Sequence, residues 1–223
     1  MDDIYSQKWR IFLRKIWPLR FIPFVDFVLT AGSLATGEVH NNSDFDVIVG
    51  VKPGRIFTVR FCCFMAFGLL GWRKKKNDTE KSGSDKICFN HFISPAAYRL
   101  SEPHNEYWKN LYSSLVPVFG NQETIQKFFN ANSYWMGKRR IYQKDSRLIY
   151  EKGNFIAGLR EKLLSGRFGN WLERIFKQVQ IRKNKMNLSQ ENTYRPRIIL
   201  NDNELEFHPH TKRIEDFCEN QKK

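Results

Sequence analysis

The chain has 223 residues and a mass of 26.6 kDa, which fits one domain of ordinary size or a small domain with an appendage. Hydrophobic residues make up 41% of it and charged residues 27%, which excludes a wholly disordered protein. Its 37 Lys and Arg against 23 Asp and Glu give a net charge of +14, which points to nucleic acid, nucleotides or another polyanion. Four scattered cysteines exclude a disulfide scaffold, so we expect reduced thiols and a cytoplasmic protein.

The first 100 residues predict alternating helices and strands. Residues 4–16 carry apolar residues at helical spacing, and Pro18 and Pro23 end that helix. Three short β-rich segments predict strands: residues 25–30, 44–51 and 86–93. Two polar segments predict loops: residues 31–43 and 73–85. Residues 55–72 are long and apolar, which favours a helix.

The longest apolar run, residues 61–72, bears on membrane association. Its 12 residues are fewer than the about 20 that a membrane-spanning helix needs. We therefore expect a buried helix and no stable membrane insertion. Because the basic residues 73–76 follow directly, a helix at the membrane edge is the alternative. Asp2 and Asp3 at the N-terminus do not fit a targeting segment.

The second half predicts mainly helices. They are expected at residues 107–119, 124–129, 149–164 and 171–182. The apolar faces of the last two are formed by Phe155, Leu159 and Leu163, and by Leu172, Ile175, Phe176 and Val179. Gly166 and Gly169 are expected to separate these two helices. Residues 197–200 and 204–207 predict a hairpin. We divide the chain into an α+β core (1–100), a helical region (101–185) and a tail (186–223).

Positive charge is concentrated in the predicted helical region. Residues 138–185 hold 14 Lys and Arg against four Asp and Glu. Charge runs are commonly solvated helix surfaces, but an excess of one sign favours a surface that attracts phosphate. The candidate residues of that surface are Arg139, Arg140, Lys144, Arg147, Arg160, Lys162, Arg167 and Lys177. We expect this surface to hold an RNA or protein acceptor.

The most informative pattern is Gly32-Ser33 followed, after ten residues, by Asp44-Phe45-Asp46. Side chains at positions i and i+2 of a strand share a face, so Asp44 and Asp46 are expected to stand together. Two carboxylates so placed repel each other unless a cation lies between them, and Mg²⁺ prefers such oxygen ligands. Gly32 lets the backbone approach a phosphate closely, and Ser33 adds a hydroxyl and an amide donor. The alternative is a Ser-Asp turn before an ordinary strand.

This combination resembles the nucleotidyltransferase superfamily with the DNA polymerase β-like fold. The layout up to residue 93 and the helical second half look more loosely like uncharacterised prokaryotic predicted nucleotidyltransferases. The resemblance implies a mixed sheet flanked by helices, with a mainly helical C-terminal region. It implies that Asp44 and Asp46 are catalytic and bind two Mg²⁺ or Mn²⁺ ions. It places the triphosphate of an NTP, expected to be ATP, on Gly32, Ser33 and Ser43.

The family's third carboxylate is the point of departure. Its expected position, in the strand 86–93, carries Asn90, which can offer a carbonyl to a metal but cannot act as a base. Asp85 and Glu38 are the alternatives for the third acid. His91 is expected to face away from Asn90 and to pack in the strand.

The resulting hypothesis is a metal-dependent nucleotidyltransferase that moves an NMP from an NTP to an acceptor hydroxyl on RNA, protein or a small molecule, and releases pyrophosphate. The first alternative is a nucleotide- or RNA-binding protein of the same fold with impaired catalysis, suggested by Asn90. A nucleotidylating toxin or its partner is a further alternative. His208, His210 and Cys218 carry metal-capable atoms, but their spacing fits no zinc pattern.

Overall fold

The computed structural model describes residues 3–102, 104, 106–136, 155–188 and 197–208. Six strands of this part form one mixed sheet in the order β4-β1-β2-β3-β6-β5. Their bounds are β1 (Val25–Thr30), β2 (Phe45–Val51), β3 (Ile87–Ile93), β4 (Val116–Gly120), β5 (Arg197–Leu200) and β6 (Glu204–His208). β2 and β3 run parallel, and the other neighbouring pairs are antiparallel.

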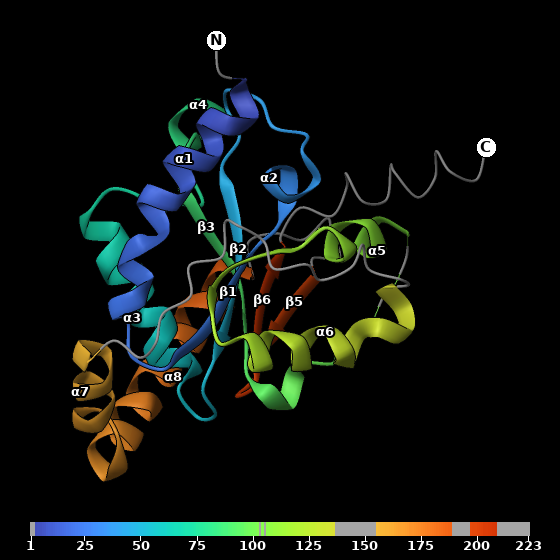
Figure 1. The fold of residues 1–223 in the computed structure, drawn as a ribbon. Helices are drawn as coiled ribbons and strands as arrows, with labels where there is room; N and C mark the ends of the chain where they lie inside the picture. The colour runs from blue at the N-terminus through green and yellow to red at the C-terminus, as the bar shows by residue number, and fades with distance from the viewer. Residues whose placement is uncertain (1–2, 103, 105, 137–154, 189–196, 209–223) are drawn as a thin grey trace.

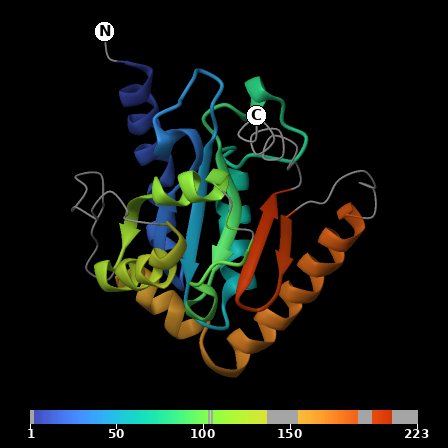
Figure 2. The same ribbon diagram turned by 90° about the vertical axis from the view of Figure 1, so that its right-hand side faces the viewer.

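Eight α-helices accompany the sheet in the described part of the chain. They are α1 (Ile4–Ile16), α2 (Gly32–Thr36), α3 (Ile56–Leu69), α4 (Glu80–Gly83), α5 (Glu106–Ser113), α6 (Gln122–Met136), α7 (Phe155–Leu163) and α8 (Gly166–Leu188). Helices α1, α3 and α8 lie on one side of the sheet, and α5 and α6 lie on the other (Figures 1 and 2). The predicted α+β class with a mixed sheet flanked by helices is therefore confirmed.

The two faces of the sheet build two separate cores. Phe45, Val47 and Val49 point from β2 into the core shared with α1 and α3. Ile48 points into the other core, where the aromatic rings of α5 and α6 pack. This alternation is what a strand buried on both faces requires. It places Asp46, two residues before Ile48, on the α5–α6 side.

The first half follows the prediction closely. The strands expected at 25–30, 44–51 and 86–93 are β1, β2 and β3, and the helices expected at 4–16 and 55–72 are α1 and α3. The hairpin also forms, and β6 pairs with β3 so that the hairpin extends the sheet. Strands from all three sequence regions thus share one sheet.

The helix predicted at 107–119 is wrong in its second half. Helix α5 ends at Ser113, and Val116–Gly120 form β4, which pairs antiparallel with β1. Pro117 explains the break, because proline removes a helical hydrogen bond and clashes with the preceding turn. An edge strand tolerates it, since β4 is at the end of the sheet and pairs only with β1 among the described strands.

Three further details differ from prediction. The loop expected at 31–43 begins with the short helix α2. Gly166 opens α8 and Gly169 lies inside it, so residues 164–165 separate α7 from α8. The predicted apolar face of these helices is only partly buried: Phe176 packs against the core, while Leu163 and Val179 are 66% and 59% exposed. Residues 149–154 of the predicted helix 149–164 lie outside the described residues.

Most of the apolar segment 55–72 forms α3, and Ile56, Cys63 and Phe67 are buried against the sheet. The expected burial of the run 61–72 holds only in part, because Met65 and Leu69 are 48% and 82% exposed. Among the described residues no helix combines the length and apolar character needed to span a bilayer.

Candidate functional site

The predicted motif residues meet at one end of the sheet, where α2 follows β1 and where β2 begins (Figure 1). The amide of Ala31 donates to the carbonyl of Asp46 over 2.9 Å, and the Thr30 hydroxyl donates to the same carbonyl over 3.3 Å. These contacts hold the turn at Gly32 beside Asp46. The pairing of β1 with β2 therefore brings together two parts of the motif that are separated by a long loop.

Gly32 is in direct contact with the side chain of Asp46. Its φ of +64° lies in the left-handed region, which residues with a Cβ rarely adopt. A Cβ atom at this position would lie 2.4 Å from Oδ2 of Asp46, too close for any real contact. Glycine is thus needed both for the backbone conformation and for the approach of the backbone to the carboxylate.

Asp44, Asp46 and Cys88 form a group whose ligand atoms lie within 4.8 Å of one another. The predicted pair of carboxylates therefore stands together. Cys88 lies in β3 and is the partner of Asp46 in the parallel pairing of β2 with β3, which brings the two residues side by side. Burial, together with the negative charges of Asp46 and Asp44, raises the pKa of the Cys88 thiol well above its usual value. A protonated thiol agrees with the hydrogen bond that Cys88 donates to Asn90.

A lysine that the sequence analysis did not single out completes the electrostatics of the site. The ammonium of Lys74 lies 2.7 Å from Oδ2 of Asp44. Burial acts to lower the pKa of Lys74, but the hydrogen bond to Asp44 and the nearby acidic groups outweigh it and raise the pKa. The two carboxylates thus attract positive charge strongly enough to hold an ammonium group in a half-buried position.

Asn90 reaches the site, as the resemblance implied, and contacts Asp46. Its Nδ2 donates to Oδ1 of Asp46 over 3.1 Å, and its Oδ1 accepts from the Cys88 thiol over 3.0 Å. In this arrangement Asn90 orients Asp46, while its carbonyl oxygen is engaged by Cys88. A different rotamer would be needed for that oxygen to serve as a metal ligand.

The two other candidates for the third acid differ in their surroundings. Asp85 forms a part-buried ion pair with Lys8 at 2.7 Å, which joins the start of β3 to α1. Glu38 is exposed in the loop after α2. Neither belongs to the group of Asp44, Asp46 and Cys88 among the described residues.

Ser43 is buried within the loop that leads to β2. Its hydroxyl contacts Nδ1 of His40 over 3.0 Å and accepts from the His40 amide over 3.0 Å, while its carbonyl accepts from Lys8. These contacts shape the loop before Asp44. Ser33 is half-buried in the first turn of α2, beside Gly32.

The expectation that His91 faces away from Asn90 is wrong. The pairing of β2 with β3 shifts register between Val47 and Ile48, so Asn90 is an extra residue and His91 pairs with Ile48. A β-bulge of this kind restores the next side chain to the same face. Asn90 and His91 therefore both point to the α5–α6 side. No local pattern in the sequence indicates the bulge at Asn90.

His91 belongs to a second polar group, which the sequence analysis missed. Its Nε2 lies 3.0 Å from Oε1 of Glu204, and the Tyr112 hydroxyl lies 3.5 Å from its Nδ1 and donates to Glu206 over 3.3 Å. All four side chains are buried. Glu204 and Glu206 alternate with Leu205 in β6, and this spacing could have indicated two acids on one face. The group joins the hairpin and α5 to β3. His91 is thus packed in the interior, as the sequence analysis expected.

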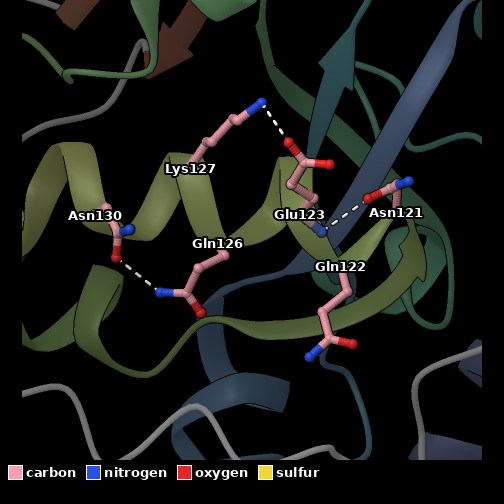
Figure 3. Close-up of a pocket in the computed structure, with 6 residues that line it drawn as sticks. All are labelled: Asn121, Gln122, Glu123, Gln126, Lys127 and Asn130. Carbon is pink, nitrogen blue, oxygen red and sulfur yellow. Dashed lines mark hydrogen bonds and ion pairs between the residues drawn. The ribbon is translucent and has the colours of Figure 1, made fainter.

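Two surface hollows lie apart from these residues. Figure 3 shows the first, at the start of α6, lined by Asn121, Gln122, Glu123, Gln126, Lys127 and Asn130. Its side chains satisfy one another: Glu123 pairs with Lys127, and Gln126 donates to Asn130. The second, on α8, is lined by Arg174, Lys177, Gln178, Ile181 and Arg182.

Only part of the predicted basic surface can be placed. Lys177 lines the hollow on α8 and also pairs with Asp202 at 2.6 Å. Arg160 donates to the carbonyl of Phe21, and Lys162 and Arg167 are exposed. Arg139, Arg140, Lys144 and Arg147 lie outside the described residues, as do the metal-capable side chains of His208, His210 and Cys218.

Comparisons with known proteins identify no relative. No protein-family model, no curated protein and no solved structure matches this chain. The functional argument therefore rests on the geometry of the site.

Proposed function

We propose that the chain is a metal-dependent nucleotidyltransferase that transfers an NMP from an NTP, with ATP as the expected donor, to an acceptor hydroxyl. The observation that carries the proposal is the close approach of the Gly32 backbone to Asp46, one of a pair of carboxylates. Gly32 approaches Asp46 so closely that no Cβ fits, and Asp44 stands in the same group. Backbone that presents amides beside paired carboxylates suits a metal-bound triphosphate.

The donor set fits Mg²⁺ or Mn²⁺. Asp44 and Asp46 offer carboxylate oxygens, and the ammonium of Lys74 at Asp44 supports a site that attracts cations. When bound, paired divalent ions would neutralise the phosphates and stabilise the attacking and leaving oxygens. Asp44 and Asp46 would hold those ions, with Asn90 orienting Asp46 through its amide.

The remaining chemistry is positioning. The amides at Gly32 and Ser33 would orient the triphosphate so that the acceptor oxygen lies in line with the α-phosphorus and the leaving pyrophosphate. The acceptor oxygen forms a bond to phosphorus, the bond to the β-phosphate oxygen breaks, and pyrophosphate leaves. The proton of the hydroxyl passes to solvent, since Asn90 cannot accept it. The chain's positive charge favours an RNA acceptor.

Asn90 also favours a second candidate, a binding protein of this fold without turnover. The side chain in the expected position of the third acid is an amide that bonds to Asp46 and Cys88. Such a protein would keep metal-dependent nucleotide binding through Asp44 and Asp46.

The test is transfer of label from α-labelled NTPs with Mg²⁺ or Mn²⁺, using RNA, protein and small-molecule acceptors. Asp44→Asn and Asp46→Asn should each lower transfer by about 10²–10³-fold, as loss of a group that stabilises transition-state charge does. Glu123→Gln, a carboxylate-to-amide change at an exposed residue of α6, is the matched control and should transfer normally.

Binding measurements separate the two candidates. Metal-dependent nucleotide binding that the Asp44→Asn variant loses, without transfer by the wild type, would support the binding protein. Neither transfer nor binding by a folded wild type would contradict both.

A further inference from the structure

The backbone fixes the position of Lys74 next to the carboxylate pair. Residues 72–74 lie alongside the start of β3. The amide of Ile87 donates to the carbonyl of Trp72 over 2.7 Å, and the amide of Lys74 donates to the carbonyl of Ile87 over 2.9 Å. Arg73 and Ile87 form a parallel bridge. This isolated bridge and its two hydrogen bonds set the Lys74 backbone beside β3.

The stem of Lys74 is also guided. Gly83, which ends α4, is buried, and a Cβ added there would lie 3.3 Å from Cε of Lys74 and 3.7 Å from Cδ. Glycine at this position leaves room for the extended lysine. The ammonium arrives at Oδ2 of Asp44 with both side chains partly shielded, at 32% and 22% exposure.

An ammonium at this oxygen competes with a divalent cation. A Mg²⁺ ion bound to the same oxygen would lie about 2.0–2.1 Å from it, within a few ångströms of the Lys74 nitrogen. Two like charges so close repel each other strongly in a partly shielded site. A cation that binds through Oδ2 of Asp44 therefore displaces Lys74, which then needs another anion. A polyphosphate that arrives with the metal supplies one.

We propose that Lys74 makes the site selective for a metal ion that arrives with a polyphosphate. Lys74 binds Asp44 in competition with the free metal ion, and it binds the phosphates once the metal has displaced it. This inference rests on the proposed function and names a specificity-determining residue for it. It implies that metal and nucleotide bind with positive coupling. Because coupling is reciprocal, each raises the affinity of the other by the same factor.

The experiment measures Mn²⁺ binding to the full chain by electron paramagnetic resonance, alone and with a non-transferable α,β-methylene analogue of ATP. Lys74→Met removes the charge and keeps the length of the stem, Lys74→Gln is a second neutral variant, and Lys74→Arg keeps the charge. Lys75→Met changes the exposed neighbouring lysine and serves as the control. Thermal melting confirms that each variant is folded.

The expected results follow from the competition. Lys74→Met and Lys74→Gln should bind Mn²⁺ alone several-fold more tightly than the wild type and should bind the analogue more weakly. The coupling factor, about 5–150-fold if it is of the size general for coupled sites, should fall several-fold but stay above one, because the metal still contacts both the carboxylates and the phosphates. Lys74→Arg should retain coupling, and Lys75→Met should match the wild type.

The outcomes distinguish this inference from the proposed function. If Asp44→Asn abolishes Mn²⁺ binding but folded Lys74→Met and Lys74→Gln keep the wild-type coupling, the role of Lys74 is wrong and the metal site stands. If Asp44→Asn leaves Mn²⁺ and analogue binding unchanged, the proposed function and this inference are both wrong.

Discussion

At the scale of single residues, the site depends on the absence of a side chain at Gly32. Its backbone has a positive φ, and the Asp46 carboxylate occupies the space of a side chain. Gly54, in the turn after β2, also has a positive φ, of +69°, but nothing lies within 4 Å of a Cβ added there. The two glycines thus separate the cost of backbone strain from the cost of displacing Asp46.

Gly32→Ala should reduce Mn²⁺ affinity by tenfold or more, because the new methyl group forces the Asp46 carboxylate away. The left-handed conformation costs an alanine about 1–2 kcal/mol in either position, so Gly32→Ala and Gly54→Ala should both lower stability. Only Gly32→Ala should lose metal affinity. Mn²⁺ titration and urea unfolding measure the two effects, and equal metal affinity in the two variants would contradict the role given to Gly32.

At the scale of elements, α8 stabilises α3 through one acid. The carboxylate of Glu173 accepts from the amides of Phe57 and Thr58 in the first turn of α3 and from the Thr58 hydroxyl. First-turn amides have no partner within their own helix, and a negative charge there is also favourable. The ring of Phe61 in α3 stacks on the ring of Phe176 in α8, with 4.1 Å between the ring centroids. This contact keeps the two helices together.

Glu173→Ala should lower the free energy of unfolding by about 2 kcal/mol, the scale of hydrogen bonds to a charged group. Glu173→Gln keeps one acceptor oxygen and should cost less. Arg174→Ala, at the exposed neighbouring position of α8, should stay within about 0.5 kcal/mol of the wild type. Urea unfolding measures all three, and an equal effect of Glu173→Ala and Arg174→Ala would refute the capping role.

At the scale of the whole molecule, the hairpin completes the sheet. β6 pairs with β3, Leu205 is buried in one core, and Glu204 and Glu206 are buried on the other side with His91. Buried carboxylates are costly unless they are hydrogen-bonded. The polar group of His91, Tyr112, Glu204 and Glu206 therefore specifies how the hairpin docks.

His91→Ala should destabilise the protein by about 1–3 kcal/mol through the buried Glu204 carboxylate left without its ring partner, in addition to the lost packing. Combining it with Glu204→Gln should cost less than the sum of the single changes, because neighbouring partners are not additive. Strictly additive costs in a double-mutant cycle would show that the two side chains are not coupled.

Local patterns in the sequence predicted the elements that carry the site. Strand alternation and turn residues predicted β1, β2, β3 and the hairpin, and residue spacing predicted that Asp44 and Asp46 stand together. These features depend on interactions between residues near one another along the chain, which periodicity and turn chemistry express directly. The nucleotidyltransferase activity itself stays a prediction.

Only the tertiary structure decided the contacts between distant segments. Lys74 reaches Asp44 across 30 positions and Glu173 reaches Phe57 across 116, and no local pattern encodes either pairing. The bulge at Asn90 and the position of β4 beside β1 arise from pairing with a neighbouring strand. For β4 the sequence carries one local signal, because Pro117 disfavours the helix. Local sequence patterns determined the strands β1, β2, β3, β5 and β6 and the place where two carboxylates meet. Long-range packing determined which lysine faces the carboxylates, because that depends on where separate segments dock.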